Sequence, residues 1–108
     1  MNQQMYSELI QGILNLLSGR VIKIVLYGSV ARGTDTPDSD IDIAVFVNTG
    51  MDPETEDRLS DMIVDLNLKY NKVFSVIDID DTLYQKWRAV TPFYQNVDRE
   101  GIVLWKAS

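Results

Sequence analysis

Residues 28–33, Gly-Ser-Val-Ala-Arg-Gly, directly follow an apolar and β-branched run, residues 21–27, that contains one lysine. Such a run predicts a buried strand that ends at Gly28. Glycine there lets the backbone come close to a ligand, and Ser29 begins a predicted short helix whose first amides are unpaired donors suited to phosphate. Arg32 adds a permanent cation. The segment therefore predicts an anion-binding turn.

Opposite charge comes from the next segment, where Asp40 and Asp42 introduce a second apolar run. Side chains alternate between the faces of a strand, so we expect the two carboxylates to share one face while Ile41 and Ile43 enter the core. Hard oxygen ligands suit Mg²⁺ or Mn²⁺, and the chain has no histidine or cysteine that would favour zinc. A divalent ion facing bound phosphates is the basis of phosphoryl or nucleotidyl transfer.

The ordered combination of Gly28-Ser29, Ala31-Arg32-Gly33 and Ser39-Asp40-x-Asp42 resembles the minimal nucleotidyltransferase (MNT) domains of the DNA polymerase β-like superfamily. These domains often accompany a HEPN-domain protein in prokaryotic toxin–antitoxin pairs. The resemblance covers nearly the whole chain and implies one domain, residues 1–108. The implied fold is α/β (α+β) and similar to the polymerase β palm, with a mixed three- to four-stranded sheet and helices packed on one face.

The resemblance also implies a reaction, in which a nucleoside monophosphate passes from a nucleoside triphosphate to a hydroxyl acceptor. ATP is the expected donor, Mg²⁺ or Mn²⁺ the expected cofactor, and a tyrosine of a HEPN-type toxin the expected acceptor, which gives the chain an antitoxin role. Drug-modifying members carry a further domain for their acceptor, so a small-molecule acceptor is not expected. The residues implied in nucleotide binding are Gly28, Ser29, Arg32 and Ser39, and those implied in metal binding and catalysis are Asp40 and Asp42.

A third carboxylate is harder to assign. Members of the superfamily carry it near the start of their third strand, which this chain is predicted to form over residues 72–79. Ser75 occupies the matching place in one register, whereas Asp78 serves as the catalytic and metal-binding residue if the register is shifted. With Ser75 there, the chain is a non-catalytic nucleotide-binding or protein-binding antitoxin module. A subunit of a two-chain enzyme is a further alternative, and oligomer formation stays open.

Composition restricts the partners and the compartment. With 108 residues and 45% apolar content the chain suits one small core. Its net charge of −6 argues against direct binding of duplex nucleic acid, which depends on clustered lysine and arginine. We expect a cytoplasmic protein, because no apolar run has the length of a membrane span and the N-terminal residues do not resemble a signal peptide.

The remaining elements follow from periodicity and cap residues. Apolar spacing predicts a helix over residues 5–17, and Asp52 followed by Pro53 predicts the start of a second helix that ends near Tyr70. A short helix is expected over residues 82–90, with Asp80 or Asp81 as its cap. Residues 92–94 are expected to break the chain before a short terminal strand.

Overall fold

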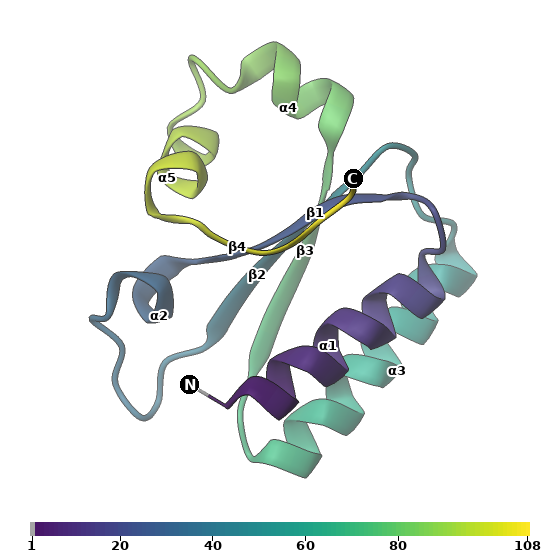
Figure 1. Cartoon of the computed structure of the whole chain (residues 1–108), viewed down its shortest axis with the longest axis vertical. Coiled ribbons are helices and arrows are strands. Elements are labelled where there is room, and N and C mark those ends of the chain that lie inside the picture. The colour runs from purple at the N-terminus through teal and green to yellow at the C-terminus, as the bar shows by residue number, and fades with distance from the viewer. Residues whose placement is uncertain (1) are drawn as a thin grey trace.

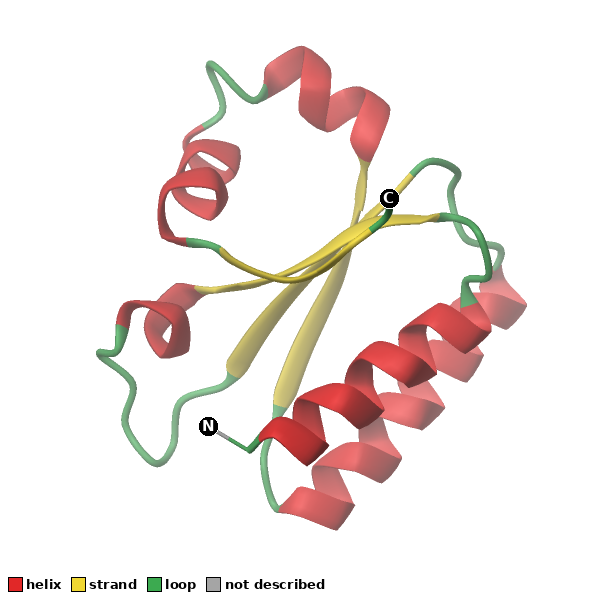
Figure 2. Cartoon of the chain, viewed as in Figure 1, coloured by secondary structure: helices red, strands yellow, loops and turns green. Residues whose placement is uncertain are grey.

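The computed structural model describes residues 2–108 and contains a four-stranded mixed sheet in the order β3-β2-β1-β4 (Figures 1 and 2). The strands are β1 (Val21–Tyr27), β2 (Ile41–Val47), β3 (Phe74–Asp80) and β4 (Ile102–Lys106). β1 runs antiparallel to both β2 and β4, and β3 runs parallel to β2. The strand that leads into the Gly-Ser turn is therefore held on both sides by hydrogen-bonded neighbours.

Two long helices that lie side by side cover one face of the sheet (Figure 1). They are α1 (Gln3–Leu16) and α3 (Pro53–Tyr70). Alternate residues of β2 point toward these helices, and Ile43 and Val45 are fully buried in the resulting cluster. Asn2 caps α1 by accepting a hydrogen bond from the Met5 amide at 3.1 Å. The packing confirms both predicted helices.

The opposite face carries a second, smaller cluster beneath α4 (Asp81–Trp87) and α5 (Pro92–Glu100) (Figure 1). Phe46 of β2 and Tyr84 of α4 meet there edge to face, with ring centroids 4.7 Å apart. Helices thus lie on both faces of the sheet, and the prediction that they pack on one face only was wrong, because α4 and α5 cover the second apolar cluster. Asp80 caps α4 through hydrogen bonds from the Thr82 and Leu83 amides at 2.8 and 3.2 Å.

The prediction of a break at residues 92–94 was wrong, because α5 begins there. Proline suits the first position of a helix, where its missing amide hydrogen has no partner to lose. Thr91 precedes it as the N-terminal cap residue, although its side chain makes no capping hydrogen bond. Within residues 2–108, no helix is both long and apolar enough to span a membrane.

Candidate functional site

The chain leaves β1 through Gly28, which opens the short helix α2 (Gly28–Arg32) with a φ of 76°. This left-handed conformation is strained for residues that carry a Cβ. In addition, a Cβ at Gly28 would collide with the carboxylate of Asp42 on the neighbouring strand. Tyr27 and Asp42 are direct register partners, so the antiparallel ladder brings the carboxylate to the turn. Glycine is required here by both the backbone and the neighbour.

A cavity of about 360 Å³ opens beside this turn. It contains four residues that the sequence assigns to the site, Gly28, Ser29, Arg32 and Asp42, which come from α2 and β2. Its remaining wall comes mainly from α5. The full lining is Tyr27, Gly28, Ser29, Arg32, Asp42, Phe93, Asn96, Val97 and Glu100.

Asp42 is half-buried where it lines this cavity, and burial raises the pKa of its carboxyl. The negative charge of Asp40 raises that pKa further, whereas the cation of Arg32 lowers it. Asp40 is exposed and lies immediately before β2. The two predicted carboxylates therefore feel each other's charge, an arrangement that a divalent cation would stabilise.

The register of β3 places the two candidates for the third carboxylate differently. Ser75 is the direct partner of Asp42, whereas Asp78 pairs with Val45 farther along the sheet. Strand alternation assigns Asp78 to the face where Phe74 packs against α1 and α3, and its side chain is exposed. The structure therefore does not bring Asp78 to Asp40 and Asp42, and the register agrees with the Ser75 alternative.

The donor set fits a hard divalent cation of the Mg²⁺ class. Magnesium in nucleotide sites is typically held by one or two carboxylates, with substrate phosphates and water completing its shell. Asp40 and Asp42 provide such a pair. Across the described residues 2–108, no cluster of three or more carboxylate, histidine or cysteine side chains is close enough to hold a metal ion.

Ser39, also assigned to nucleotide binding, lies outside the cavity lining. Its hydroxyl accepts a hydrogen bond from the Thr36 amide at 2.9 Å and contacts the Thr36 hydroxyl at 3.3 Å. It therefore closes the loop that leads to Asp40. Ser39 supports the position of a site residue without facing the cavity itself.

Sequence reasoning missed the wall that α5 contributes. Phe93 stacks edge to face on Tyr27, with ring centroids 5.7 Å apart, and Glu100 forms an ion pair with Arg32 at 2.9 Å. The Thr-Pro start at residues 91–92 was the available signal for this helix. Its position over the motif depends on long-range packing that a local pattern does not contain.

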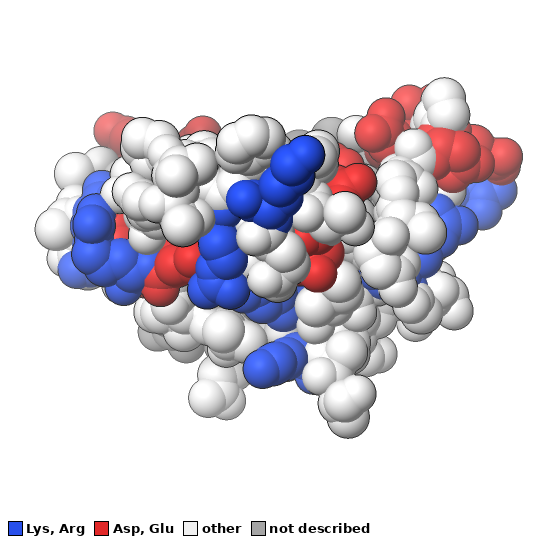
Figure 3. Space-filling view, turned by 90° about the horizontal axis from the view of Figure 1, so that it is seen from above, with Lys and Arg blue, Asp and Glu red and all other residues white. Residues whose placement is uncertain are grey.

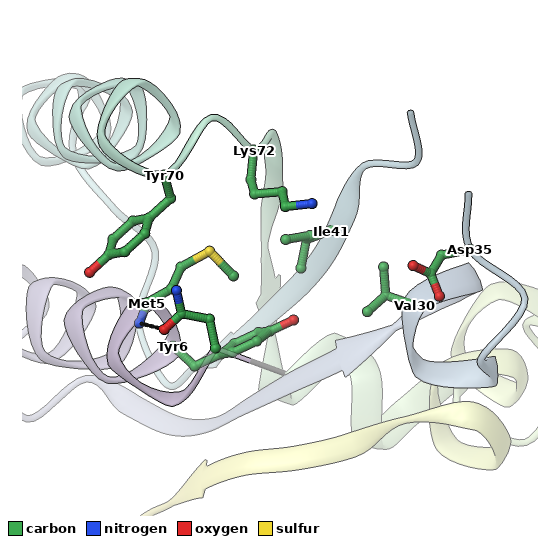
Figure 4. Close-up of a pocket in the computed structure, with 8 residues that line it drawn as sticks. Met5, Tyr6, Val30, Asp35, Ile41, Tyr70 and Lys72 are labelled. Atoms are coloured by element: carbon green, nitrogen blue, oxygen red, sulfur yellow. Dashed lines mark hydrogen bonds between the residues drawn. The ribbon is translucent and has the colours of Figure 1, made fainter. Parts of the chain in front are cut away.

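A second cavity of about 410 Å³ lies on the other face of the sheet, between the first turn of α1 and the end of α3 (Figure 4). Figure 4 shows the Tyr6 ring beneath Ile41 and the side chains of Val30 and Asp35 on the far side. Ile41 and Asp42 are neighbours that face opposite cavities. Burial, together with the charge of Asp35, raises the pKa of the Tyr6 hydroxyl.

Charges of both signs intermingle on the face seen in Figure 3, where acidic side chains gather at one end and basic ones form no continuous surface. Clustered cations are the usual feature of a surface that binds duplex nucleic acid. That this chain does not bind duplex nucleic acid stays a prediction from its net charge of −6.

Comparison with known proteins gives one family and several relatives. The model of the nucleotidyltransferase domain family matches residues 7–99. A protein of Methanocaldococcus jannaschii named "Putative protein adenylyltransferase" is 35% identical over 98 residues, which are 91% of this chain and 92% of that protein.

Solved structures share the fold. A toxin–antitoxin complex crystallised with AMP-PNP contains a chain that is 23% identical, with a TM-score of 0.64 and coverage of 95% of this chain and 74% of that one. A complex of a tri-AMPylated HEPN toxin of Shewanella oneidensis with its MNT antitoxin contains a chain that is 20% identical, with a TM-score of 0.63 and coverage of 99% and 74%.

Proposed function

The chain belongs to the nucleotidyltransferase domain family, and on this premise we propose that it transfers AMP from ATP to a tyrosine hydroxyl of a HEPN-domain toxin. The observation that carries the proposal is one cavity that joins the Gly28-Ser29 turn and Arg32 to the carboxylate of Asp42. Groups that attract phosphate thus lie beside a group that attracts a divalent cation. Such a pairing suits a metal-bound nucleoside triphosphate.

Each residue has a distinct part in the proposed reaction. Ser29 offers its hydroxyl and amide to the terminal phosphates, and Arg32 offsets their charge. Gly28 leaves room for the Asp42 carboxylate to approach the bound nucleotide. Asp40 and Asp42 would hold Mg²⁺ or Mn²⁺, which supplies charge stabilisation for the phosphates in the transition state.

The transfer forms one bond and breaks one. The tyrosine oxygen of the acceptor bonds to the α-phosphorus, the bond from that phosphorus to the bridging oxygen breaks, and pyrophosphate leaves. The hydroxyl proton of the acceptor passes to solvent. Positioning and electrostatic stabilisation account for most of the catalysis in reactions of this type.

The acceptor class rests on two features of the relatives. The relative of 35% identity is named as a protein adenylyltransferase, and a neighbouring structure contains a tri-AMPylated HEPN toxin with an MNT antitoxin. A protein acceptor would reach the site by docking against the α5 side, where Phe93 is exposed.

A second candidate function is favoured by the position of Ser75. Because a serine stands opposite Asp42, β3 adds no third carboxylate beside Asp40 and Asp42. Such a site binds a nucleotide without transferring it, and the protein then neutralises its partner by contact alone. The two functions differ in turnover and agree in nucleotide binding.

Transfer of labelled AMP from ATP to a co-expressed HEPN-domain protein tests the proposal. We expect label on the acceptor with Mg²⁺ or Mn²⁺, none in chelator, and none after replacement of the acceptor tyrosine by phenylalanine. Asp42→Asn should also abolish labelling. A wild-type protein that forms a stable complex with the toxin, binds ATP and never labels it would refute transfer and favour the contact-only function.

A further inference from the structure

Arg32 is the only cation among the described residues that line the proposed nucleotide cavity, and it is already engaged. Its guanidinium donates to the Glu100 carboxylate at 2.9 Å, across 68 residues of sequence. The Glu100 side chain is 20% exposed and that of Arg32 46%. Both residues line the same cavity as Asp42, so the Glu100 carboxylate and an incoming phosphate would compete for one cation.

The position of Glu100 is fixed by the end of α5. Gly101 follows it, and a side chain there would collide with the backbone of Val97 and with Val25 of β1. The helix is also held from its other side, where the Asp98 carboxylate accepts a hydrogen bond from Tyr84 and pairs with Arg88 at 3.3 Å. Glu100 is therefore presented by a packed element.

We infer that Glu100 is a positioning residue that holds Arg32 at the cavity wall in the free protein and releases it to the triphosphate. The inference rests on the proposed nucleotide site but not on transfer to any acceptor. It assigns Glu100 two opposing effects on nucleotide binding. The carboxylate orients the guanidinium in advance, which favours binding, and competes with phosphate for it, which opposes binding.

Arg32 exchanges an ion pair with Glu100 for one with phosphate, and the strengths of the two pairs decide which is favoured. A partly exposed ion pair contributes little net stability, because both groups remain solvated. Arginine and phosphate form charge-assisted and often bidentate hydrogen bonds, which are stronger. The exchange therefore favours a ligand with several negative charges, and an uncharged nucleoside gains nothing from it.

Glutamine at position 100 separates the two effects. It keeps an oxygen that accepts from Arg32 but removes the competing charge. We expect Glu100→Gln to bind Mg-ATP and Mg-tripolyphosphate about three- to tenfold more tightly than wild type, in line with the modest worth of such pairs. Glu100→Ala should gain less, because it also loses the orienting contact, and uncharged adenosine should show no change with either variant.

Calorimetry of the full chain measures these affinities, with Glu54→Gln as the matched control. Glu54 also pairs with an arginine, Arg58 at 2.7 Å, but lies on α3 away from the cavity. We expect its substitution to leave binding unchanged. In an Arg32→Gln background the gain from Glu100→Gln should fall below about twofold, because the exchange requires the guanidinium. Because the Arg32→Gln variants are expected to bind more weakly, their affinities are measured from shifts in melting temperature at millimolar tripolyphosphate.

Three results with the variants would overturn the inference. They are unchanged or weaker triphosphate binding by Glu100→Gln, a full gain that persists with Arg32→Gln, and an equal gain for adenosine. Wild-type protein that binds neither Mg-ATP nor Mg-tripolyphosphate would overturn it as well. If the binding results hold but no acceptor is ever labelled, the proposed transfer fails and the role of Glu100 stands.

Discussion

The carboxylate of Asp42 occupies the space that a side chain at Gly28 would need. Gly28 opens α2 directly after β1, and it meets Asp42 of β2 because Tyr27, just before the glycine, pairs with Asp42 in the antiparallel ladder. The glycine turn and the carboxylate that is proposed to hold a cation are thus in direct steric contact. Changing either one changes both.

Gly28→Ala should therefore damage the site beyond its effect on stability. A left-handed alanine costs about 1–2 kcal/mol in the free energy of unfolding, and the added methyl group also displaces the Asp42 carboxylate. We expect Mg-ATP binding to fall at least about tenfold, equal to about 1.4 kcal/mol. Denaturation and calorimetry on the same samples separate the two effects.

Gly19→Ala is the matched control, because Gly19 has the same φ of 76° and nothing within 4 Å of its built Cβ. It should lose similar stability and keep nucleotide binding. Equal binding losses in the two variants would show that the collision with Asp42 is unimportant.

Asp42→Asn should raise the stability of the free protein at neutral pH. The pKa of Asp42 is raised above its ordinary value of 3.8, so the folded state binds a proton more readily than the unfolded chain. The contribution of this group to stability therefore falls as pH rises from that value through the folded pKa. Asparagine removes the penalty. Melting temperatures should differ at about pH 7 and converge at about pH 3.

Asp57→Asn is the control, because it removes an exposed carboxylate of α3, and its effect on the melting temperature is compared with that of Asp42→Asn. A wild type that is more stable than Asp42→Asn at neutral pH would contradict the raised pKa. The same Asp42→Asn protein should bind Mn²⁺ more weakly, which places stability and function in opposition at this residue.

Ser75→Asp should complete a set of three carboxylates, because Ser75 stands opposite Asp42 in the parallel ladder. We expect Mn²⁺ affinity to rise about tenfold, equal to about 1.4 kcal/mol, through one more hard oxygen ligand. Asp78→Asn should leave Mn²⁺ affinity unchanged, since alternation assigns Asp78 to the other face. Titration of Mn²⁺ by electron paramagnetic resonance measures both, and the reverse ranking would restore Asp78 as the ligand.

Tyr84→Phe tests the support beneath α5. It removes the hydrogen bond to the Asp98 carboxylate while keeping the edge-to-face contacts with Phe46 and Tyr94. We expect a loss of about 1–3 kcal/mol in the free energy of unfolding. Chemical denaturation near neutral pH measures this loss, and an unchanged midpoint would show that the hydrogen bond adds nothing.

We expect Tyr84 also to make the stability of the fold depend on pH in the alkaline range. Burial, followed by the hydrogen bond to Asp98, raises the pKa of Tyr84 from 10.0 to about 12. The folded state thus keeps a proton that the unfolded chain loses, and stability falls as pH rises through this range. Tyr84→Phe should lack that part of the decline, so the two melting curves should approach each other near pH 12.

The motif and its strands were predictable because their signals are local. An apolar run that ends in Gly-Ser predicts β1 and α2, and acids that alternate with isoleucines predict β2. Neither prediction requires knowing which elements pack against them. The Asp52-Pro53 start likewise predicted α3. The contribution of α5 was not predictable, because its place over the cavity depends on contacts such as Phe93 with Tyr27, far apart in sequence.

The position of the third carboxylate could not be predicted from the sequence for a different reason. Ser75 and Asp78 differ by three positions, so they lie on opposite faces of a regular strand. Choosing between them requires the register of β3 against β2, which β-propensity does not specify. Only the pairing of Ser75 with Asp42 supplies it.

The elements that form the walls of the cavity are far apart in sequence, so they are synthesised at different times. The turn at Gly28 leaves the ribosome well before α5, and Arg32 and Glu100 are 68 residues apart. β4, which pairs with β1, follows later still. A nascent chain can therefore pair β1 with β2 while the proposed nucleotide cavity still lacks the wall that α5 forms. The complete cavity is assembled only after α5 has been synthesised, so the proposed binding of nucleotide requires that synthesis has passed Glu100.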